Sequence, residues 1–267
     1  MPEGDTIHKV AAVMNETLAG ETVKHCIVRG RAPRTDANLT VDGVDAHGKH
    51  LFVNFDDGRA LRSHLGMHGS WHRYPPGAAW RKPRRLAAIE LHTDPWEFVC
   101  FNAKEVEWLR QGSFRHRDLL AFLGPDVVVE APPIDRVLKR VRGLLPGDAP
   151  AVDVLLDQRV AAGIGNVYKS EVLFIHRVHP ATMLESMSDA LLGELFEESN
   201  RLLRRNLGGG PRVTRDDGAA NKWVYGRKGK PCAGCGGPIR MERMGKHLRV
   251  TYFCPRCQGS QQGRRHA

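Results

Sequence analysis

The chain has 267 residues, close to the size at which a single hydrophobic core stops growing, so we expect two core-bearing units. Hydrophobic residues make up 41% and charged residues 26%, a globular composition that excludes wholesale disorder. Forty Lys and Arg against thirty Asp and Glu give a formal net charge of +10, which favours a polyanionic partner without specifying which one. The sequence contains no apolar run of about 18 residues and no signal-peptide pattern at its start, so we expect a cytoplasmic protein without a membrane partner.

The first expected element is a helix that begins right after Glu3 and shows its apolar spacing over residues 5–19. Asp5 is its expected N-cap, and Gly20 is expected to end it. The apolar residues at helical spacing are Ile7, Val10, Ala11, Met14 and Leu18. This pattern predicts a helix that buries one stripe.

Short β-like runs follow from residue 21 to residue 101. The runs 50–55 and 59–65 flank an Asp-Asp-Gly turn and predict a hairpin, and 86–92 and 96–101 predict a second strand pair. The N-terminal unit is therefore expected to be a β-sandwich or a barrel that carries one helix.

Loop composition around 125–133 predicts a boundary, after which the apolar spacing of 134–207 becomes helical. Within this second unit, 152–160 and 167–174 are expected to be two helices separated by a glycine-rich turn. A long polar stretch, 208–221, follows. The expected fold class is thus α+β and multidomain.

Four of the six cysteines form two C-x-x-C pairs separated by eighteen residues, the spacing of a tetracysteine zinc site. These residues are Cys232, Cys235, Cys254 and Cys257. A chance arrangement and a redox role are the alternatives, but no βαβ pattern surrounds the pairs. The pattern predicts one structural zinc ion. Cys26 and Cys100 stand alone in apolar surroundings and are expected to be buried without chemistry.

Basic residues crowd the cysteine module, and a solvated positive face is their simplest interpretation. They are Arg227, Lys228, Lys230, Arg240, Arg243, Lys246, Arg249 and Arg256. The second helix of the expected pair starts at Asn166, behind Gly163 and Gly165, where backbone amides and the Asn side chain can hold a phosphate. Such residues also start many helices that bind no ligand.

Four segments together resemble the formamidopyrimidine-DNA glycosylase and endonuclease VIII family. They are Met-Pro-Glu-Gly at 1–4, Gly-Ile-Gly-Asn-Val-Tyr-Lys-Ser-Glu at 163–171, and the runs 224–232 and 249–258 around the cysteines. The resemblance covers nearly the whole chain in the family's order. It implies an N-terminal β-sandwich with one helix, a helix-two-turn-helix domain and a C-terminal zinc finger, which act as a monomer on damaged DNA.

The resemblance and the composition shifts together set the expected domains. These are a catalytic β-sandwich at 1–124, a linker at 125–133, a helix-two-turn-helix domain at 134–223, a zinc finger at 224–258 and a tail at 259–267. Because the resemblance is to bacterial-type repair enzymes, the expected place of action is the nucleoid.

The resemblance also assigns the chemistry to the start of the chain. Removal of Met1 exposes Pro2 as a secondary amine that attacks the sugar C1′ and forms an iminium intermediate. An α-amine has a pKa of about 7.8, far below about 10.4 for lysine, so much more of it is neutral at pH 7. Glu3 is implied to act as acid and base beside the sugar. In an unrelated chain, both residues are simply an exposed terminus.

Four further residues are implied to contact DNA. Lys49 corresponds to the lysine of the β-sandwich that contacts phosphate and assists elimination, and Arg249 to the arginine of the zinc hairpin that grips phosphates. Asn166 corresponds to the family's phosphate-binding asparagine. Met67 resembles the residue that fills the space left by the extruded nucleotide, with core packing as its alternative. Lys49 and Arg249 are otherwise ordinary surface residues.

Two departures from the family pattern stand out. Thr6 occupies a position where many members carry a second glutamate, and residues 102–108 lack the usual Arg-x-Phe wedge. The expected function is a glycosylase and AP lyase that removes oxidised bases, pyrimidines before purines, and nicks the strand by β- and δ-elimination. An oxidised-purine glycosylase and a zinc-dependent DNA-binding protein without catalysis are the alternatives.

Overall fold

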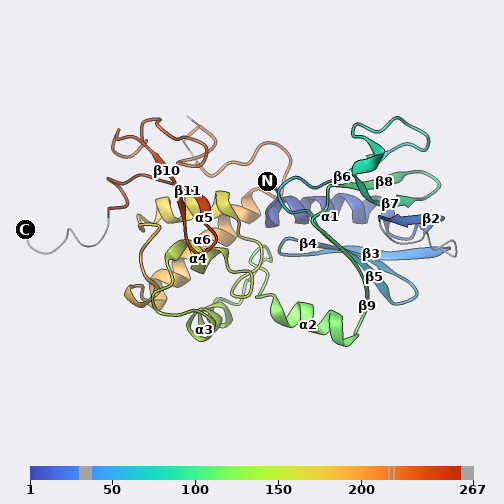
Figure 1. Ribbon diagram of the computed structural model, residues 1–267, viewed down its shortest axis with the longest axis horizontal. Coiled ribbons are helices and arrows are strands. Elements are labelled where there is room, and N and C mark those ends of the chain that lie inside the picture. The colour runs from blue at the N-terminus through green and yellow to red at the C-terminus, as the bar shows by residue number, and fades with distance from the viewer. Residues whose placement is uncertain (30–37, 216, 219, 260–267) are drawn as a thin grey trace, which may run out of the picture. The chain divides into compact units, whose positions relative to one another are not determined.

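The computed structural model describes residues 1–29, 38–215, 217–218 and 220–259. The chain divides into two compact units, Met1–Ala121 and Phe122–Ala267, whose elements are labelled in Figure 1. No helix in the described ranges has the length and apolar character needed to span a membrane.

The first unit starts with α1 (Gly4–Leu18), which begins right after Glu3 as expected. The N-cap is Glu3, so the assignment of Asp5 as N-cap was wrong. Glu3 caps through its backbone, because its carbonyl accepts the N–H groups of Thr6 at 2.9 Å and Ile7 at 3.1 Å while its side chain makes no capping hydrogen bond. Glutamate is not among the favoured N-cap residues, which is why the sequence pointed to Asp5.

The C-terminal end of α1 and its buried stripe are as expected. Gly20 follows the helix with φ +81°, a conformation that glycine adopts without a side-chain clash, and its N–H donates to the Val41 carbonyl at 2.8 Å. The buried stripe contains Ile7, Ala11, Met14 and Leu18, and Val10 is partly buried beside it. This face packs against strands β3 (Leu39–His47) and β4 (His50–Phe55).

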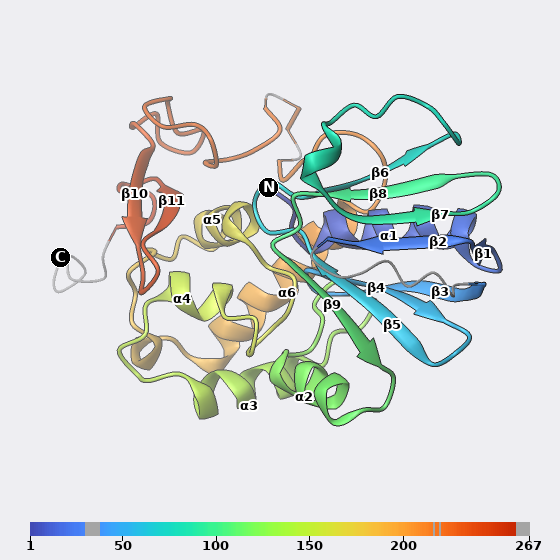
Figure 2. The same cartoon turned by 45° about the vertical axis from the view of Figure 1, so that its right-hand side comes forward.

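Two separate antiparallel sheets form the rest of the unit, as Figure 2 shows. In spatial order, the first contains β1 (Thr22–Val23), β3 (Leu39–His47), β4 (His50–Phe55), β5 (Arg59–His64) and β9 (Glu105–Arg110). The second contains β2 (His25–Val28), β7 (Ala87–His92), β8 (Glu97–Phe101) and β6 (Ser70–Tyr74), with a 3-10 turn at Arg84–Leu86. The fold is therefore a β-sandwich and not a barrel. Both expected hairpins, β4–β5 and β7–β8, are confirmed.

One core joins the two sheets and α1. It includes Phe55 and Leu61 from the first sheet and Ile89 and Phe98 from the second, all at most 2% exposed. Cys26 and Cys100 are buried, as expected, and burial raises the pKa of the Cys26 thiol to about 12. These two cysteines are inert parts of the apolar interior.

The second unit is mainly helical. Its helices are α3 (Ile134–Leu144), α4 (Ala151–Leu156), α5 (Asn166–Ile175) and α6 (Asp189–Arg205), with a 3-10 turn at Leu184–Ser186, and α2 (Phe114–Phe122) runs into it from the first unit. Helix α4 ends four residues before the expected Val160, because the Asp157 carboxylate accepts the Arg159 N–H at 2.9 Å and closes a local turn. Val127 and Val128, in the stretch expected as linker, are buried in the core of this unit.

The C-terminal module is a hairpin of β10 (Arg240–Met244) and β11 (Arg249–Phe253). It packs against α5 within the second unit. The side chain of Gln258, fully buried, accepts the Cys254 N–H and donates to the Val178 carbonyl, both at 2.8 Å. The module is thereby fastened to the helical part of its own unit.

Candidate active site and nucleic-acid interface

The start of the chain places a buried carboxyl group directly beside Pro2. The Glu3 side chain is 0% exposed, whereas Pro2 is half-buried and Met1 is 42% exposed. Both Pro2 and Glu3 lie at the N-terminal end of α1, which is the positive end of the helix dipole. A buried acid next to the second residue is unusual for a chain terminus, which is ordinarily exposed.

Lys49 occupies a two-residue turn that joins β3 to β4. His47 and His50 pair across the turn, and Gly48 has φ +56°, as the first central position of a type II′ turn requires. Lys49 is half-buried. The short turn therefore fixes the position of its backbone with little freedom.

A buried arginine lies next to this turn, which the sequence analysis did not find. The guanidinium of Arg62, on β5, donates to His50 Nδ1 at 2.9 Å and to the carboxylates of Glu105 at 3.1 Å and Glu107 at 3.0 Å. Arg62 is 4% exposed. No local sequence pattern predicts the contacts with the two glutamates, because the pairing of β5 with β9 is what brings them to Arg62.

Two histidines beside Arg62 are neutral at physiological pH. Burial, followed by the charges of His64 and Arg62, lowers the pKa of His50 to about 3. Burial also lowers the pKa of His64 to about 4, against the opposing charge of Glu105. The two rings lie 4.9 Å apart, and protonating either one places a cation beside Arg62.

Met67 projects from the loop between β5 and β6. Its side chain is 58% exposed, so it is not part of the core. Gly66 has φ +63°, and a Cβ there would lie 2.9 Å from the Lys104 Cβ. The Gly69 N–H donates to the Leu65 carbonyl at 3.0 Å. The loop is thus a tight turn that presents Met67 to its surroundings.

In the second unit, Asn166 is the first residue of α5, as expected. Gly165 is the N-cap, and Gly163 has φ +116° with room for no more than a tight Cβ, 3.3 Å from Val128. The Lys169 N–H donates to the Gly165 carbonyl at 2.9 Å, which starts the helix. This glycine-rich entry has the form of a phosphate-binding helix start.

Three consecutive polar residues of α5 are fully buried against the C-terminal module. Lys169 Nζ donates to Thr251 Oγ1 at 2.8 Å and to the Val250 carbonyl at 3.1 Å, and the Tyr252 N–H donates to Ser170 Oγ at 3.4 Å. Strand β11, whose first residue is Arg249, is therefore held against the helix that begins with Asn166. These contacts are not predictable from the local sequence, because a Lys-Ser-Glu run in a helix is normally solvent-exposed.

Glu171 completes this attachment. One carboxylate oxygen accepts the N–H groups of Val224 at 2.9 Å and Tyr225 at 2.7 Å, and the other accepts the Trp223 N–H at 2.7 Å and the Thr214 hydroxyl. Four donors thus converge on one buried carboxylate. Glu171 thereby holds residues 223–225, which lead into the cysteine module, against α5.

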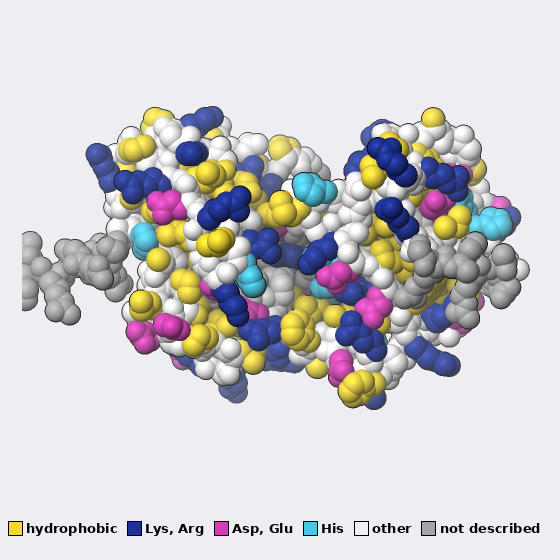
Figure 3. Space-filling view, viewed as in Figure 1, with side chains coloured by type: hydrophobic (Ala, Val, Ile, Leu, Met, Phe, Trp, Pro, Cys, Tyr) yellow, Lys and Arg dark blue, Asp and Glu magenta, His cyan; other side chains and the backbone are white. Residues whose placement is uncertain are grey.

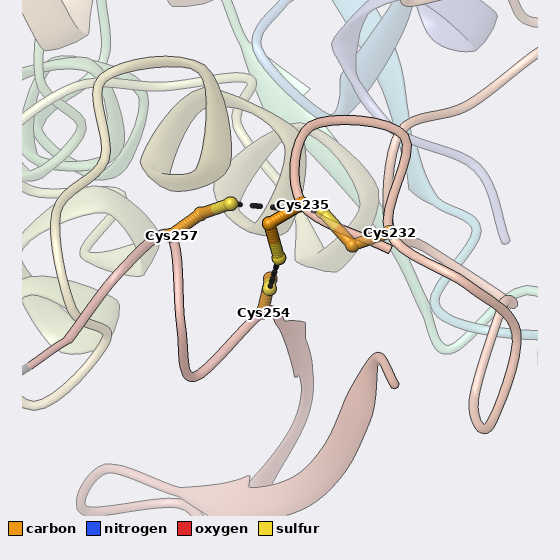
Figure 4. A group of neighbouring side chains, drawn as sticks. All are labelled: Cys232, Cys235, Cys254 and Cys257. Carbon is orange, nitrogen blue, oxygen red and sulfur yellow. Dashed lines mark hydrogen bonds between the residues drawn. The ribbon is translucent and has the colours of Figure 1, made fainter. Parts of the chain in front are cut away.

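The four cysteines come together at the tip of the C-terminal module, as Figure 4 shows. Their sulfur atoms all lie within 4.8 Å of one another, with 3.7 Å between Cys232 and Cys257 and 3.5 Å between Cys235 and Cys254. Tetrahedral zinc with Zn–S bonds of about 2.3 Å separates its sulfur ligands by about 3.8 Å. The donor set and its spacing therefore fit a zinc ion.

The surroundings of the thiols shift their pKa values in opposite directions. A backbone N–H from Gly237, followed by hydrogen bonds with the thiols of Cys254 and Cys257, lowers the pKa of Cys235 to about 7. Burial is the main cause that raises the pKa of Cys254 and Cys257. Four sulfurs this close repel one another when ionised, and a divalent cation removes that repulsion.

Arg249 is exposed at the start of β11, opposite Met244. Among the other basic residues of the module, Arg240 is also exposed on the hairpin. Lys and Arg side chains are spread over the face of each unit drawn in Figure 3. The structure places Arg249 and Asn166 in the second unit, on contacting elements, and Pro2, Glu3, Lys49 and Met67 in the first.

A β-sandwich that opens with a helix, a helical unit with a glycine-rich helix start, and a tetracysteine hairpin define the architecture of formamidopyrimidine-type DNA glycosylases. Three family models match in this order: the formamidopyrimidine-DNA glycosylase N-terminal domain over residues 1–108, its H2TH domain over 123–216, and the zinc finger found in FPG and IleRS over 229–259. The chain belongs to the formamidopyrimidine-DNA glycosylase and endonuclease VIII family.

Curated relatives cover the whole length. The chain is 34% identical to the DNA-(apurinic or apyrimidinic site) lyase Nei2 of Mycolicibacterium smegmatis over 97% of this chain and 99% of that protein. It is 35% identical to endonuclease 8 2 of Mycobacterium tuberculosis over 97% and 100%, respectively, and 35% identical to the formamidopyrimidine-DNA glycosylase of Methylococcus capsulatus over 97% and 98%.

A solved structure shows the same fold. The formamidopyrimidine-DNA glycosylase of Lactococcus lactis, non-covalently bound to DNA that contains an AP site, matches with a TM-score of 0.81 and 20% identity, over 97% of this chain and all of that one. At this identity the match speaks for the fold, and it confirms the expected sandwich, helical domain and zinc-finger architecture.

Proposed function

We propose that this DNA glycosylase and AP lyase of base excision repair removes oxidised pyrimidines from DNA, with Pro2 as its nucleophile. The observation that carries the proposal is the pairing of Pro2 with a fully buried Glu3 at the positive end of α1. Relatives named Nei2 and endonuclease 8 2, at 34% and 35% identity, favour the pyrimidine branch.

Removal of Met1 makes the Pro2 nitrogen a secondary amine. The positive end of α1 favours the neutral form of this amine, which is the nucleophile. As the nitrogen bonds to C1′, the bond between C1′ and the base breaks, and the base departs with its electron pair and a proton. Glu3 is the acid that supplies this proton, because its position in the chain is next to the nucleophile.

The Pro2 nitrogen then gives its proton to the Glu3 carboxylate, which passes it to the ring oxygen O4′ as the bond between C1′ and O4′ breaks, and an iminium is left at C1′. The iminium makes the C2′ hydrogen acidic. Loss of that proton shifts electrons toward C3′ and expels the 3′ phosphate, which is the β-elimination, and a second elimination at C5′ completes the δ step. Lys49 steadies a phosphate of the reacting nucleotide from its rigid turn, and the charge of its ammonium favours the departing phosphate. We assign Met67 to the space that the extruded nucleotide leaves.

Asn166 and Arg249 bind phosphates of the damaged strand from α5 and β11, two elements that the hydrogen bonds of Lys169 and Ser170 hold together. One zinc ion, bound by the four cysteine thiolates, has a structural role in this proposal. The four cysteine sulfurs would complete a tetrahedral zinc site and leave no position for water. The ion holds the two knuckles together, and Arg249 is carried on the strand that ends in one of them.

Borohydride trapping tests the nucleophile. Wild-type protein mixed with an abasic duplex and borohydride should become covalently attached to DNA, whereas Pro2→Gly, which keeps only a primary α-amine, should still bind the duplex with much less attachment. Equal trapping by the two proteins contradicts the assignment. Absence of trapping by the wild type favours a non-catalytic DNA-binding protein.

The lesion preference needs a separate measurement. Excision should be faster from thymine-glycol duplexes than from 8-oxoguanine duplexes under single-turnover conditions. The reverse order would place the enzyme in the oxidised-purine branch while leaving the trapping result intact.

A further inference from the structure

We propose that Lys104 is a specificity-determining residue that contacts the unpaired base opposite the extruded nucleotide. The inference rests on the proposed function, since it needs Met67 to enter the duplex. It comes from residues 102–108, where the chain lacks the Arg-x-Phe pattern and instead carries one lysine and two glutamates. The structure places the two glutamates in one environment and the lysine in another.

The two glutamates turn into the sheet. Glu105 and Glu107 both accept hydrogen bonds from the buried Arg62, and Glu107 also accepts one from Arg115 at 2.8 Å. Burial opposes ionisation of Glu105, but the charge of Arg62 and its hydrogen bond outweigh burial and lower the pKa of Glu105. The hydrogen bond from Arg115 is the main cause of the lowered pKa of Glu107. Their negative charge is thus balanced by arginines within the same unit.

Lys104 is held beside the loop that carries Met67. Its N–H donates to the His64 carbonyl at 2.9 Å, and its Cβ is so close to Gly66 that a Cβ on that glycine would lie 2.9 Å away. Gly66 directly precedes Met67, so the side chains of Lys104 and Met67 lie on neighbouring segments. Strand β9, which starts at Glu105, fixes this neighbourhood through its register with β5.

The ammonium of Lys104 is available to a ligand. The side chain is 67% exposed, and its ion pair is a 3.5 Å contact with Glu105, whose side chain is itself 43% exposed. Such exposed pairs contribute little free energy and are easily exchanged for another acceptor. Glu105 is also engaged by Arg62, so it competes weakly for this lysine. The backbone is rigidly placed while the charged end is free to move.

The ammonium of Lys104 can donate hydrogen bonds to the base that loses its partner. When Met67 fills the vacated space, the opposite base presents hydrogen-bond acceptors that its partner no longer occupies. Lysine offers three donors and no acceptor, and the four bases differ in how many acceptors they present and where. A contact of this kind makes the rate depend on the opposite base. A phosphate contact from the same lysine does not, because phosphates carry no sequence information.

The test compares wild type with Lys104→Met, which keeps the aliphatic stem beside Gly66 and removes the ammonium. Strand cleavage is measured under single-turnover conditions on four duplexes that carry an abasic site opposite A, C, G or T. Lys24→Ala is the control, because Lys24 is exposed and paired with the exposed Asp94 elsewhere in the unit. Thermal unfolding of each protein verifies that the sandwich is intact.

The wild-type rates should differ among the four duplexes, and Lys104→Met should lose about tenfold on the preferred one and bring the four rates together. Lys24→Ala should keep the wild-type order. Equal rates for wild type on all four duplexes, an unchanged order in Lys104→Met, or an equal loss on all four would each overturn the proposal. Borohydride trapping of wild type on the same duplexes separates this failure from failure of the proposed function, because trapping depends on Pro2 and not on Lys104.

Discussion

Replacing Glu171 with glutamine tests how the C-terminal module is attached to the helical unit. The carboxylate accepts four hydrogen bonds at 0% exposure, from the N–H groups of Trp223, Val224 and Tyr225 and from the Thr214 hydroxyl. Glutamine keeps one acceptor oxygen and replaces the other with an NH2 group. Whichever way the amide turns, its NH2 group faces at least one backbone donor.

The magnitude follows from these contacts. At least one buried backbone N–H loses its acceptor, at about 1–3 kcal/mol each, and the charge assistance of the surviving bonds is lost as well. We expect a total destabilisation of about 3–5 kcal/mol, in the range for breaking a buried charged network. For a unit of this size this corresponds to a fall in Tm of about 10 °C. The sequence analysis gave no indication of this role.

Urea unfolding followed by circular dichroism, with zinc content measured in parallel, is the assay. Glu197→Gln is the matched control, since Glu197 lies exposed on α6 and should change stability by less than about 0.5 kcal/mol. A Glu171→Gln variant as stable as this control would refute the reasoning. It would mean that the four hydrogen bonds add nothing beyond those that the unfolded chain makes with water.

Three more predictions concern the metal, the phosphate contact and pH. Complete zinc removal, or Cys254→Ser at the fully buried ligand, should unfold the C-terminal module and abolish DNA binding, and unchanged binding by the zinc-free protein contradicts the structural role. Arg249→Ala should weaken duplex binding and reduce the slope of log K against log salt by about 1, so an identical slope would remove Arg249 from the phosphate contacts. Burial lowers the pKa of His50 to about 3 and of His64 to about 4, below the ordinary 6.5, so the unfolded chain binds more protons between these values. The first unit should therefore lose stability as pH falls from about 6.5 toward 4, by about 1.4 kcal/mol per pH unit for each histidine that stays neutral. A urea midpoint that does not change across this pH range would contradict the assignment of both histidines as neutral.

The features that could be predicted from the sequence depend on residues that lie close together along the chain. The α1 stripe, the β4–β5 hairpin and the two cysteine knuckles each depend on residues a few positions apart, and all three are confirmed. The error at the N-cap of α1 is also local. Glu3 caps through its backbone carbonyl alone, which no side-chain preference can reveal.

The features that the sequence did not reveal depend on distant pairings. Arg62 meets Glu105 and Glu107 only because β9 pairs with β5, and nothing in 102–108 identified that strand. Lys169 and Glu171 are buried because β11 and the segment before it pack on α5, more than fifty residues away along the chain. Polar residues on a helix face carry the same pattern whether they face water or a partner, so burial of this kind needs the tertiary structure.

The most direct test of the whole account is to identify the residue that becomes linked to DNA. Wild-type protein is trapped on an abasic duplex with borohydride, digested with protease, and the DNA-linked peptide is sequenced by mass spectrometry. The account predicts a peptide that begins at Pro2, with Met1 absent and the sugar carried on the proline nitrogen. Attachment through a lysine, or fully active protein that retains Met1, would contradict it.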